Sequence, residues 1–160
     1  MSPSGFRRNR GTATVEHSQF KQMDQVYSQS VDPNMKPIDI LLVEDDAGEA
    51  FLIGEILAEF PLPLKLRIAR DGMEALLMLA SGVFQPGLII VDLNLPYISG
   101  HGVIERFHPN DVPIVVFSSS PNEADKQRAL KLGAREYIQK PMHLHAYKDA
   151  VRGIVEKWAV

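Results

Sequence analysis

Apolar and polar residues follow one another along this chain in blocks that predict alternating strands and helices. From residue 38 onward, short apolar stretches rich in Val and Ile are separated by longer stretches with the signals of helices. We predict strands at residues 38–43, 64–68, 88–91, 113–117 and 136–138. Strands that each precede a helix are typical of a parallel sheet with helices on both of its faces.

Capping signals and glycines bound the helices between these strands. Helix starts are predicted at Asp46-x-x-Glu49, Asp71-x-x-Glu74 and Ser120-Pro121-Asn122-Glu123. The first two are capping boxes, and the third makes Ser120 the N-cap. Gly82 and Gly133 are placed to end the second and fourth helices. The third helix is predicted from about Gly100 to Phe107, and the last from about Met142.

The patterns within two of the strands indicate where they lie in the sheet. Residues 64–68 alternate apolar and polar side chains, which is typical of an edge strand with one solvent-facing side. Residues 88–91 are all aliphatic, as in a strand that is buried on both faces. Asp92 follows this strand directly, at the carboxyl end where open α/β sheets bind their ligands.

Acidic residues follow two of the predicted strands at equivalent points. Glu44 and Asp45 come after the first strand, and Asp92 comes after the third. If these strands are neighbours, the carboxylates converge at one end of the sheet and repel one another unless a cation lies among them. Hard oxygen ligands of this kind suit Mg²⁺. A metal ion there would lower the electrostatic cost of bringing an anionic phosphoryl group to Asp92.

Two further polar residues end the fourth and fifth strands. Ser118 offers a hydroxyl hydrogen bond, and Lys140 can place an ammonium group against a phosphate. Either residue alone is typical of a turn or of a solvated surface. Together with the acids at the same ends of other strands, they predict a phosphate-binding site.

Composition narrows the class of protein. The 160 residues suffice for one domain with a segment left over, and 45% hydrophobic residues is ordinary for a globular core. The chain has no cysteine, which excludes disulfides and thiolate metal sites. It has no apolar run of membrane-spanning length and no signal-peptide core, so we expect a cytoplasmic protein without a membrane partner.

Charge divides the chain unevenly. Residues 1–37 carry five basic and three acidic side chains, whereas the remainder carries twelve basic and seventeen acidic ones. An acidic globular part argues against DNA as a partner. Residues 1–36 lack a sustained apolar periodicity, so we expect a disordered or loosely ordered extension before a domain at residues 37–160.

The predicted last helix carries one apolar stripe. Its members are Leu144, Tyr147, Val151, Ile154 and Trp158. We expect most of the stripe to pack on the sheet and Trp158 to lie beyond the rim of the sheet, as a candidate partner contact. His101 and His108 are expected at exposed loop or helix-end positions.

Four segments resemble the receiver domains of two-component response regulators. They are residues 42–46, 91–96, 113–119 and 133–141, within a match that covers about residues 37–158. The resemblance implies a flavodoxin-like (βα)5 three-layer sandwich, with a five-stranded parallel sheet in the order 2-1-3-4-5. It also implies a cis peptide bond between Lys140 and Pro141.

The same resemblance implies a role for each residue of the site. Asp92 would be the phosphoacceptor, taking a phosphoryl group from a phosphohistidine of a sensor kinase. The implied Mg²⁺ ligands are Glu44, Asp45, Asp92 and the backbone carbonyl of Asn94. The implied phosphoryl-binding and switch residues are Ser118, Ser119, Tyr137 and Lys140. No organic cofactor is expected.

The resemblance describes a signalling protein that promotes its own phosphorylation and dephosphorylation and is not otherwise an enzyme. Its expected partner is a sensor histidine kinase. A phytochrome-type kinase is one candidate, because Pro61-Leu62-Pro63 and Trp158 are similar to the phytochrome-associated group. The last helix is a candidate surface for a homodimer.

Two other classes of function stay open. A pseudo-receiver scaffold, which is never phosphorylated, would be expected to lose part of the set of acids, lysine and hydroxyl that this chain keeps. A magnesium-dependent phosphohydrolase of the haloacid-dehalogenase type also uses a strand-end aspartate as its nucleophile. It needs a second aspartate as general acid, where this chain has Asn94.

Overall fold

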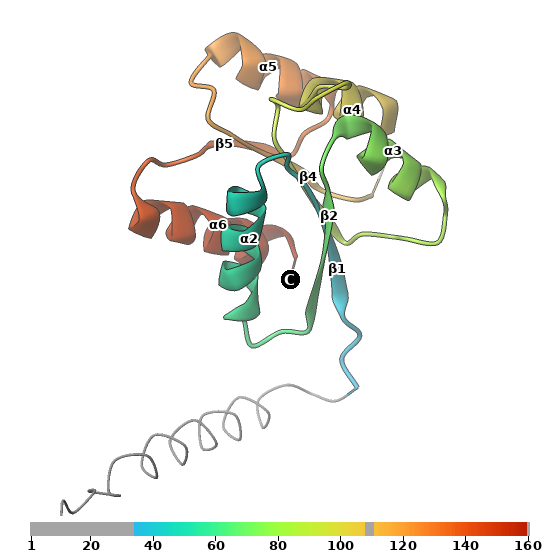
Figure 1. Cartoon of the computed structure of the whole chain (residues 1–160), viewed down its shortest axis with the longest axis vertical. Helices are drawn as coiled ribbons and strands as arrows, with labels where there is room; N and C mark the ends of the chain where they lie inside the picture. Colours follow the sequence, from blue (N-terminus) through green and yellow to red (C-terminus); the bar gives the residue numbers. More distant parts are fainter. Residues whose placement is uncertain (1–33, 108–110, 160) are drawn as a thin grey trace, which may run out of the picture. The chain divides into compact units, whose positions relative to one another are not determined.

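The computed structural model describes residues 34–107 and 111–159, which fold around one parallel sheet (Figure 1). Within these ranges the sheet has five strands in the order β2-β1-β3-β4-β5, as predicted. The strands are β1 (Ile38–Val43), β2 (Leu64–Ala69), β3 (Leu88–Val91), β4 (Ile114–Ser118) and β5 (Glu136–Gln139). The edge position predicted for residues 64–68 is confirmed. The expected N-terminal extension lies outside the described residues except for residues 34–36.

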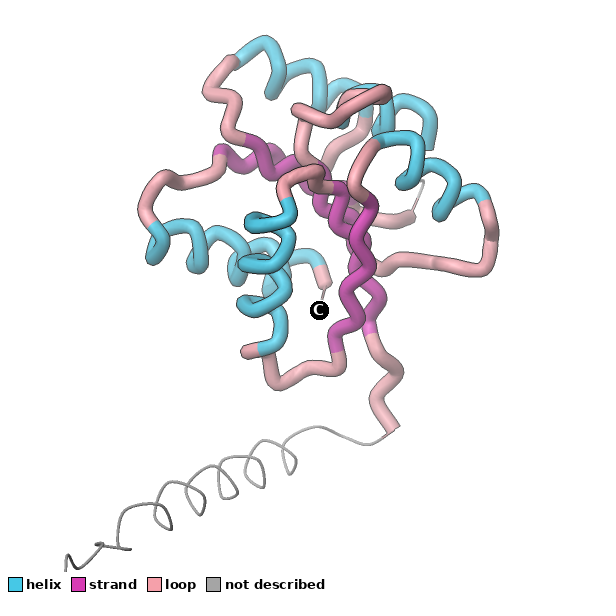
Figure 2. Tube along the Cα trace, viewed as in Figure 1, coloured by secondary structure: helices cyan, strands magenta, loops and turns pink. Residues whose placement is uncertain are grey.

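Helices cover both faces of this sheet, which gives the three layers of a flavodoxin-like fold (Figures 1 and 2). They are α2 (Ala47–Ala58), α3 (Gly72–Ala80), α4 (Gly100–Phe107), α5 (Glu123–Leu132) and α6 (Leu144–Trp158). The helices α2 and α6 pack on one face, and α3, α4 and α5 pack on the other. The predicted fold class is therefore confirmed.

Two hydrophobic cores follow from the alternation of side chains along the central strands. On β1, Ile40 and Leu42 point toward α2 and α6, where they pack with Ile53. Leu41 and Val43 point to the opposite face and join the core beneath α3, α4 and α5. All five side chains are buried. The middle of the sheet is thus apolar on both faces, and its polar groups gather at the strand ends.

The N-caps of α2 and α3 are the predicted residues. Asp46 Oδ1 accepts the backbone N–H of Glu49 at 2.8 Å, and Asp71 Oδ1 accepts that of Glu74 at 2.8 Å. The two glutamates do not close the capping boxes, however. The Glu74 carboxylate accepts from the backbone N–H of Arg70 at 2.7 Å, and Glu49 faces the site described below.

The predicted N-cap of α5 is wrong. The N-cap is Asn122, whose Oδ1 accepts the backbone N–H of Ala124 at 2.9 Å. The hydroxyl group of Ser120 instead donates to Asp125 Oδ2 at 2.6 Å. Because Asn is as effective an N-cap as Ser, a polar contact for Ser120 elsewhere is enough to move the start of the helix.

Left-handed glycines follow α3 and α5, as predicted. Gly82 has a φ of 68° and Gly133 has a φ of 115°, values that side chains with a Cβ rarely adopt. The last helix, α6, begins at Leu144 with His143 as its N-cap.

Two expectations about individual residues are wrong. Every peptide bond in the described part of the chain is trans, including Lys140–Pro141. The trans form is the lower-energy state of an X–Pro bond, so the local sequence does not require the cis form. His101 is buried rather than exposed, because its Nε2 lies 3.0 Å from the backbone oxygen of Asp125 and links α4 to α5. His108 lies outside the described residues.

The apolar stripe of α6 packs on the sheet. Tyr147, Val151 and Ile154 are buried in the core beneath α2 and α6, as predicted. Trp158 does not lie beyond the rim, because it packs against the same core and its indole N–H donates to Glu136 Oε2 at 2.7 Å. Among the described residues, no helix has both the length and the apolar character that a bilayer span requires.

Candidate functional site

The register between β1 and β3 brings the predicted acids together. Val43 is paired with Val91, and the backbone N–H of Asp92 donates to the carbonyl oxygen of Val43 at 3.0 Å. The residues that follow these valines therefore leave the sheet side by side. Carboxylate oxygens of Glu44, Asp45 and Asp92 all lie within 4.8 Å of one another.

These acids differ in their exposure to solvent. Glu44 and Asp92 are buried, with 3% and 6% of their surfaces exposed, whereas Asp45 is exposed. Glu44 Oε1 is held by the backbone N–H of Asp46 at 3.0 Å. The cluster is thus anchored on its inner side and open to water at Asp45.

The spacing of the acids fits a divalent cation. Ligand oxygens lie about 2.0–2.6 Å from Mg²⁺ or Ca²⁺, so oxygens less than 5 Å apart can share one ion. Carboxylates are hard ligands, which suits Mg²⁺ and Mn²⁺. The predicted fourth ligand, Asn94, is exposed, and its backbone N–H donates to Asp92 Oδ1 at 3.4 Å.

Lys140 extends over the ends of the strands to the same acids. Its backbone N–H donates to the carbonyl oxygen of Ser118 at 2.8 Å, which fixes the start of its side chain beside β4. The ammonium nitrogen lies 2.7 Å from Glu44 Oε2 and 3.2 Å from Asp92 Oδ2. The structure therefore brings together the strand-end acids and the strand-end lysine, as the sequence predicts.

A further carboxylate, which sequence reasoning missed, also contacts this lysine. Glu49 Oε2, in the first turn of α2, lies 2.6 Å from Lys140 Nζ. The same oxygen accepts a hydrogen bond from the hydroxyl of Tyr147 in α6 at 3.0 Å. A signal for it was present, because an acid in the first turn after Glu44 and Asp45 must lie near the same edge of the sheet.

Burial and charge shift the pKa values at the centre of the site. Burial raises the pKa of Glu44 from 4.5 to about 6, although hydrogen bonds from Lys140 and Asp46 act in the opposite direction. Burial alone would lower the pKa of Lys140. Hydrogen bonds to Glu44 and Glu49 and the charge of Asp92 outweigh burial and raise that pKa above its ordinary value. The lysine is therefore a permanent cation, and the carboxylates around it outnumber it.

The other predicted phosphoryl-binding and switch residues meet at Ser120. The buried hydroxyl oxygen of Ser118 accepts the backbone N–H of Ser120 at 3.3 Å. The hydroxyl of Tyr137 donates to the carbonyl oxygen of Ser120 at 2.7 Å. Ser119, which lies between Ser118 and Ser120 in the chain, is exposed. A movement of the Ser118 hydroxyl would therefore act on the residue that holds Tyr137.

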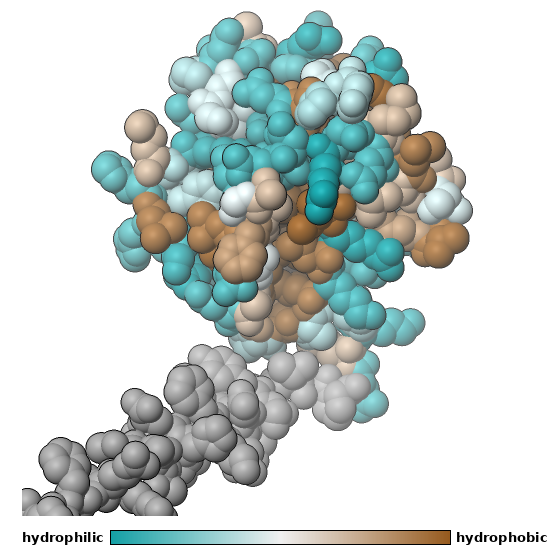
Figure 3. Space-filling model, in the orientation of Figure 1, coloured by the Kyte–Doolittle hydropathy of each residue, from teal (hydrophilic) through white to brown (hydrophobic). Residues whose placement is uncertain are grey.

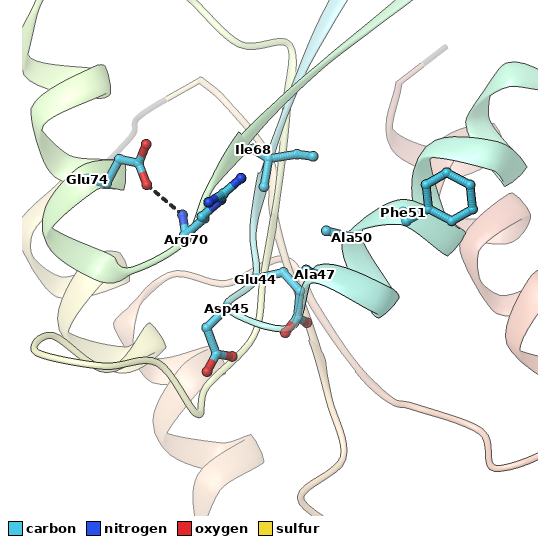
Figure 4. A pocket seen from close by; sticks show the side chains of 8 residues that line it. All are labelled: Glu44, Asp45, Ala47, Ala50, Phe51, Ile68, Arg70 and Glu74. Carbon is cyan, nitrogen blue, oxygen red and sulfur yellow. Dashed lines mark hydrogen bonds between the residues drawn. The ribbon is translucent and has the colours of Figure 1, made fainter.

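A pocket of about 450 Å³ adjoins the acids on the side of β2. Figure 4 shows its lining residues, which are Glu44, Asp45, Ala47, Ala50, Phe51, Ile68, Arg70 and Glu74. Phe51 and Ile68 are 69% and 39% exposed, and hydrophobic side chains gather over the α2 and β2 side of the molecule in Figure 3. The acidic cluster thus lies beside a partly apolar surface.

This fold and this site define a class of flavodoxin-like proteins, in which a carboxylate cluster faces a lysine at the carboxyl end of a parallel sheet. The family model of the response regulator receiver domain matches residues 40–152. The chain therefore belongs to the receiver domain family of two-component response regulators. Receiver domains are signalling modules that bind a divalent metal ion.

Phytochrome response regulators are among the similar proteins. The chain is 33% identical over 136 residues to response regulator Rcp1 of Synechocystis sp., covering 79% of this chain and 92% of Rcp1. It is 35% identical to the phosphorylated cyanobacterial phytochrome response regulator RcpA, with a TM-score of 0.73 over 78% of this chain and 95% of that one. The Mn²⁺-bound form of Rcp1 is 33% identical, with a TM-score of 0.71 over 76% of this chain and 94% of that one.

Proposed function

We propose that this chain is a phosphoacceptor response regulator, whose Asp92 receives a phosphoryl group from a phosphohistidine of a sensor histidine kinase. One observation carries the proposal. An oxygen of Asp92 lies 3.2 Å from the ammonium group of Lys140, while carboxylate oxygens of Asp92, Glu44 and Asp45 lie within 4.8 Å of one another. A nucleophilic carboxylate between a fixed cation and a metal-binding pair is suited to phosphoryl transfer, which depends on positioning and charge neutralisation.

The transfer exchanges one bond to phosphorus for another. A carboxylate oxygen of Asp92 attacks phosphorus, and the P–N bond to the kinase imidazole breaks. The imidazole nitrogen keeps the bonding electrons and takes up a proton, and Asp92 becomes an acyl phosphate. Lys140 would pair with one phosphoryl oxygen and Ser118 would donate to another, with Ser119 beside it. Tyr137 would then change position with Ser118.

We infer that the metal ion is Mg²⁺, held by Glu44, Asp45, Asp92 and the backbone carbonyl of Asn94. When bound, it would neutralise the charge of the phosphoryl oxygens as they approach the carboxylate. The hard oxygen donor set supports this inference, and so does the Mn²⁺-bound form of the relative Rcp1.

The proposal extends to the partners of the protein. The similarity to phytochrome response regulators favours a phytochrome-type histidine kinase as the phosphoryl donor. A second copy of the chain is the proposed partner of the last helix, and the acidic domain at residues 37–160 is proposed not to bind DNA. The protein would act in the cytoplasm and promote only its own phosphorylation and dephosphorylation.

The two alternative classes lack an observation of this kind. A phosphohydrolase of the haloacid-dehalogenase type needs a general acid at Asn94, whose amide has no proton to give in that role. A pseudo-receiver scaffold does not require the close contacts that Lys140 makes with Glu44 and Asp92.

Incubation with acetyl phosphate and Mg²⁺, followed by intact-mass measurement, tests the proposed function. The wild-type chain should gain one phosphoryl group, and Asp92→Asn should gain none. Asp111→Asn is the matched control, because Asp111 is exposed before the amino end of β4, whereas the acids follow the carboxyl ends of the strands, and it should behave as the wild type does. An adduct that persists in Asp92→Asn, or forms equally well in EDTA, contradicts the proposal.

A further inference from the structure

Glu49 is an anion that competes for the lysine of the phosphoryl site. Its Oε2 lies 2.6 Å from Lys140 Nζ, nearer than the 3.2 Å contact of Asp92 with the same nitrogen. It belongs to α2, not to a strand end, and it is not among the proposed metal ligands. Its role is therefore separate from that of Glu44 and Asp92.

The same carboxylate connects the site to α6. The hydroxyl of Tyr147 donates to Glu49 Oε2 at 3.0 Å, although the residues are 98 positions apart. The Tyr147 ring is only 7% exposed and packs edge-on against Phe117, with ring centroids 5.1 Å apart. Packing holds the tyrosine ring in place. The Glu49 carboxylate can therefore move away from the hydroxyl without a movement of the ring.

The ammonium group of Lys140 is fully occupied in this state. An ammonium group has three N–H donors, and oxygens of Glu44, Glu49 and Asp92 lie within 3.2 Å of its nitrogen. A phosphoryl group on Asp92 would need one of these donors. It would also add negative charge beside the carboxylates already there, which favours the withdrawal of one of them.

Glu49 is the carboxylate that is free to withdraw. Glu44 is 3% exposed on its side chain and is held by the backbone N–H of Asp46, and Asp92 carries the phosphoryl group itself. The Glu49 side chain is 34% exposed, so a rotation can place its charge in water. Such a rotation breaks the hydrogen bond with Tyr147.

We propose that Glu49 holds Lys140 in the unphosphorylated state, and that its displacement by the phosphoryl group releases the Tyr147 hydroxyl and carries the signal to α6. This inference rests on the proposed function of Asp92. It makes Glu49 a positioning residue that opposes phosphorylation, and it adds a route to α6 that does not pass through Ser118 and Tyr137.

NMR titration of the full chain with beryllofluoride, a phosphoryl mimic, in Mg²⁺ tests the inference. Glu49→Gln removes the competing charge while keeping the shape of the side chain. It should bind beryllofluoride more tightly than the wild type, by up to about fivefold, since a partly exposed charge pair contributes no more than that. Glu55→Gln is the matched control, because it removes an exposed charge from the same helix and should leave the affinity unchanged.

Tyr147→Phe tests the route to α6 in the same titration. This variant keeps the packing against Phe117 and loses the hydroxyl, so it should still bind beryllofluoride. The chemical-shift changes that binding causes in the amides of residues 144–158 should be smaller than in the wild type. Thermal unfolding of each variant confirms that the fold is intact.

The outcomes separate the two proposals. A wild-type chain that does not bind beryllofluoride overturns the proposed function, and this inference with it. If the wild type binds but Glu49→Gln binds equally or more weakly, Glu49 does not compete and the inference fails alone. If the chemical-shift changes along α6 in Tyr147→Phe are as large as in the wild type, the hydroxyl does not carry the signal to α6.

Discussion

Lys140 Nζ lies 2.7 Å from Glu44 Oε2, although the two residues are 96 positions apart. They also follow strands that are not neighbours, since β3 and β4 lie between β1 and β5 in the sheet. The lysine side chain therefore crosses the ends of two strands to reach the acids. Its charge holds together groups from both halves of the domain.

Replacing Lys140 with Met should destabilise the metal-free protein strongly. The change leaves the buried carboxylates of Glu44 and Asp92 without their cation, which should lower the free energy of unfolding by about 3 kcal/mol. Mg²⁺ should restore part of the loss, because it supplies positive charge to the same oxygens. Urea unfolding in EDTA and in Mg²⁺ measures both effects.

Lys157→Met is the matched control for this comparison. Lys157 is 58% exposed and pairs with Glu136 at 3.0 Å. Exposed pairs of this kind contribute less than about 1 kcal/mol. Equal losses for the two variants, or a loss at Lys140 that Mg²⁺ does not reduce, would show that the buried charges are not coupled as described.

Glu44 should make the stability of the metal-free protein depend on pH. Its pKa is raised from 4.5 to about 6 by burial, so the folded state favours the protonated carboxyl group more than the unfolded state does. The resulting stabilisation, about 2 kcal/mol, is fully present below pH 4.5 and is lost as the pH rises through 6.

Glu44→Gln, which imitates the protonated form, isolates this contribution. Relative to the wild type in EDTA, its free energy of unfolding should increase by about 2 kcal/mol between pH 4.5 and pH 7. Denaturant unfolding of both proteins across this range gives the difference. A difference that does not change with pH would mean that Glu44 titrates alike in the folded and unfolded states.

Removing the hydroxyl of Ser118 should separate binding from switching. Ser118→Ala loses the contact with the backbone N–H of Ser120, whose carbonyl accepts from Tyr137. The variant should still bind beryllofluoride at Asp92, because Lys140 and the proposed metal ligands are unchanged. The NMR shift changes at residues 121–150 should become smaller. Shifts as large as those of the wild type would exclude the route through Ser118 and Tyr137.

Gly100 should tolerate no side chain, because α4 starts close to the end of β3. A Cβ atom on Gly100 would lie 2.2 Å from the backbone oxygen of Asp92. Gly100→Ala should therefore lower the free energy of unfolding by about 2 kcal/mol, as forced overpacking does. Gly153→Ala, in α6 with nothing within 4 Å of the new atom, should instead raise it by up to about 1 kcal/mol. Denaturant unfolding of both variants decides whether the signs differ.

The segment before the domain should be dispensable. Residues 1–34 have no apolar periodicity in the sequence, so a chain that begins at Met35 should keep its free energy of unfolding and its phosphorylation rate. A loss of more than about 1 kcal/mol on truncation would show that this segment packs on the domain.

Much of the site was predictable because its residues follow strands directly. A strand such as Leu88–Val91 is visible in the sequence as an aliphatic run, and in a parallel sheet the next residue, Asp92, must lie at the carboxyl edge. Strand order then decides which of these residues meet. The order 2-1-3-4-5 came from a family resemblance and not from the pattern itself.

Contacts between helices could not be predicted in this way. The position of Glu49 in the first turn of α2 places it near the site, but only the structure shows that its carboxylate contacts Lys140 and Tyr147. His101 is a polar residue at a predicted helix end, where an exposed side chain is expected. The backbone oxygen of Asp125 instead gives its ring a hydrogen-bond partner in the interior. Each of these contacts depends on a residue far away in the chain.

The positions of the site residues along the chain also bear on the synthesis of the protein. Glu44 and Asp45 leave the ribosome first, Asp92 follows, and Lys140 emerges when most of the domain has already been synthesised. Chains are synthesised from the N-terminus, so a partly made chain holds the acids without their cation. A chain that ends before Lys140 would therefore lack the cation that contacts Glu44 and Asp92, and with it one component of the proposed phosphoryl site.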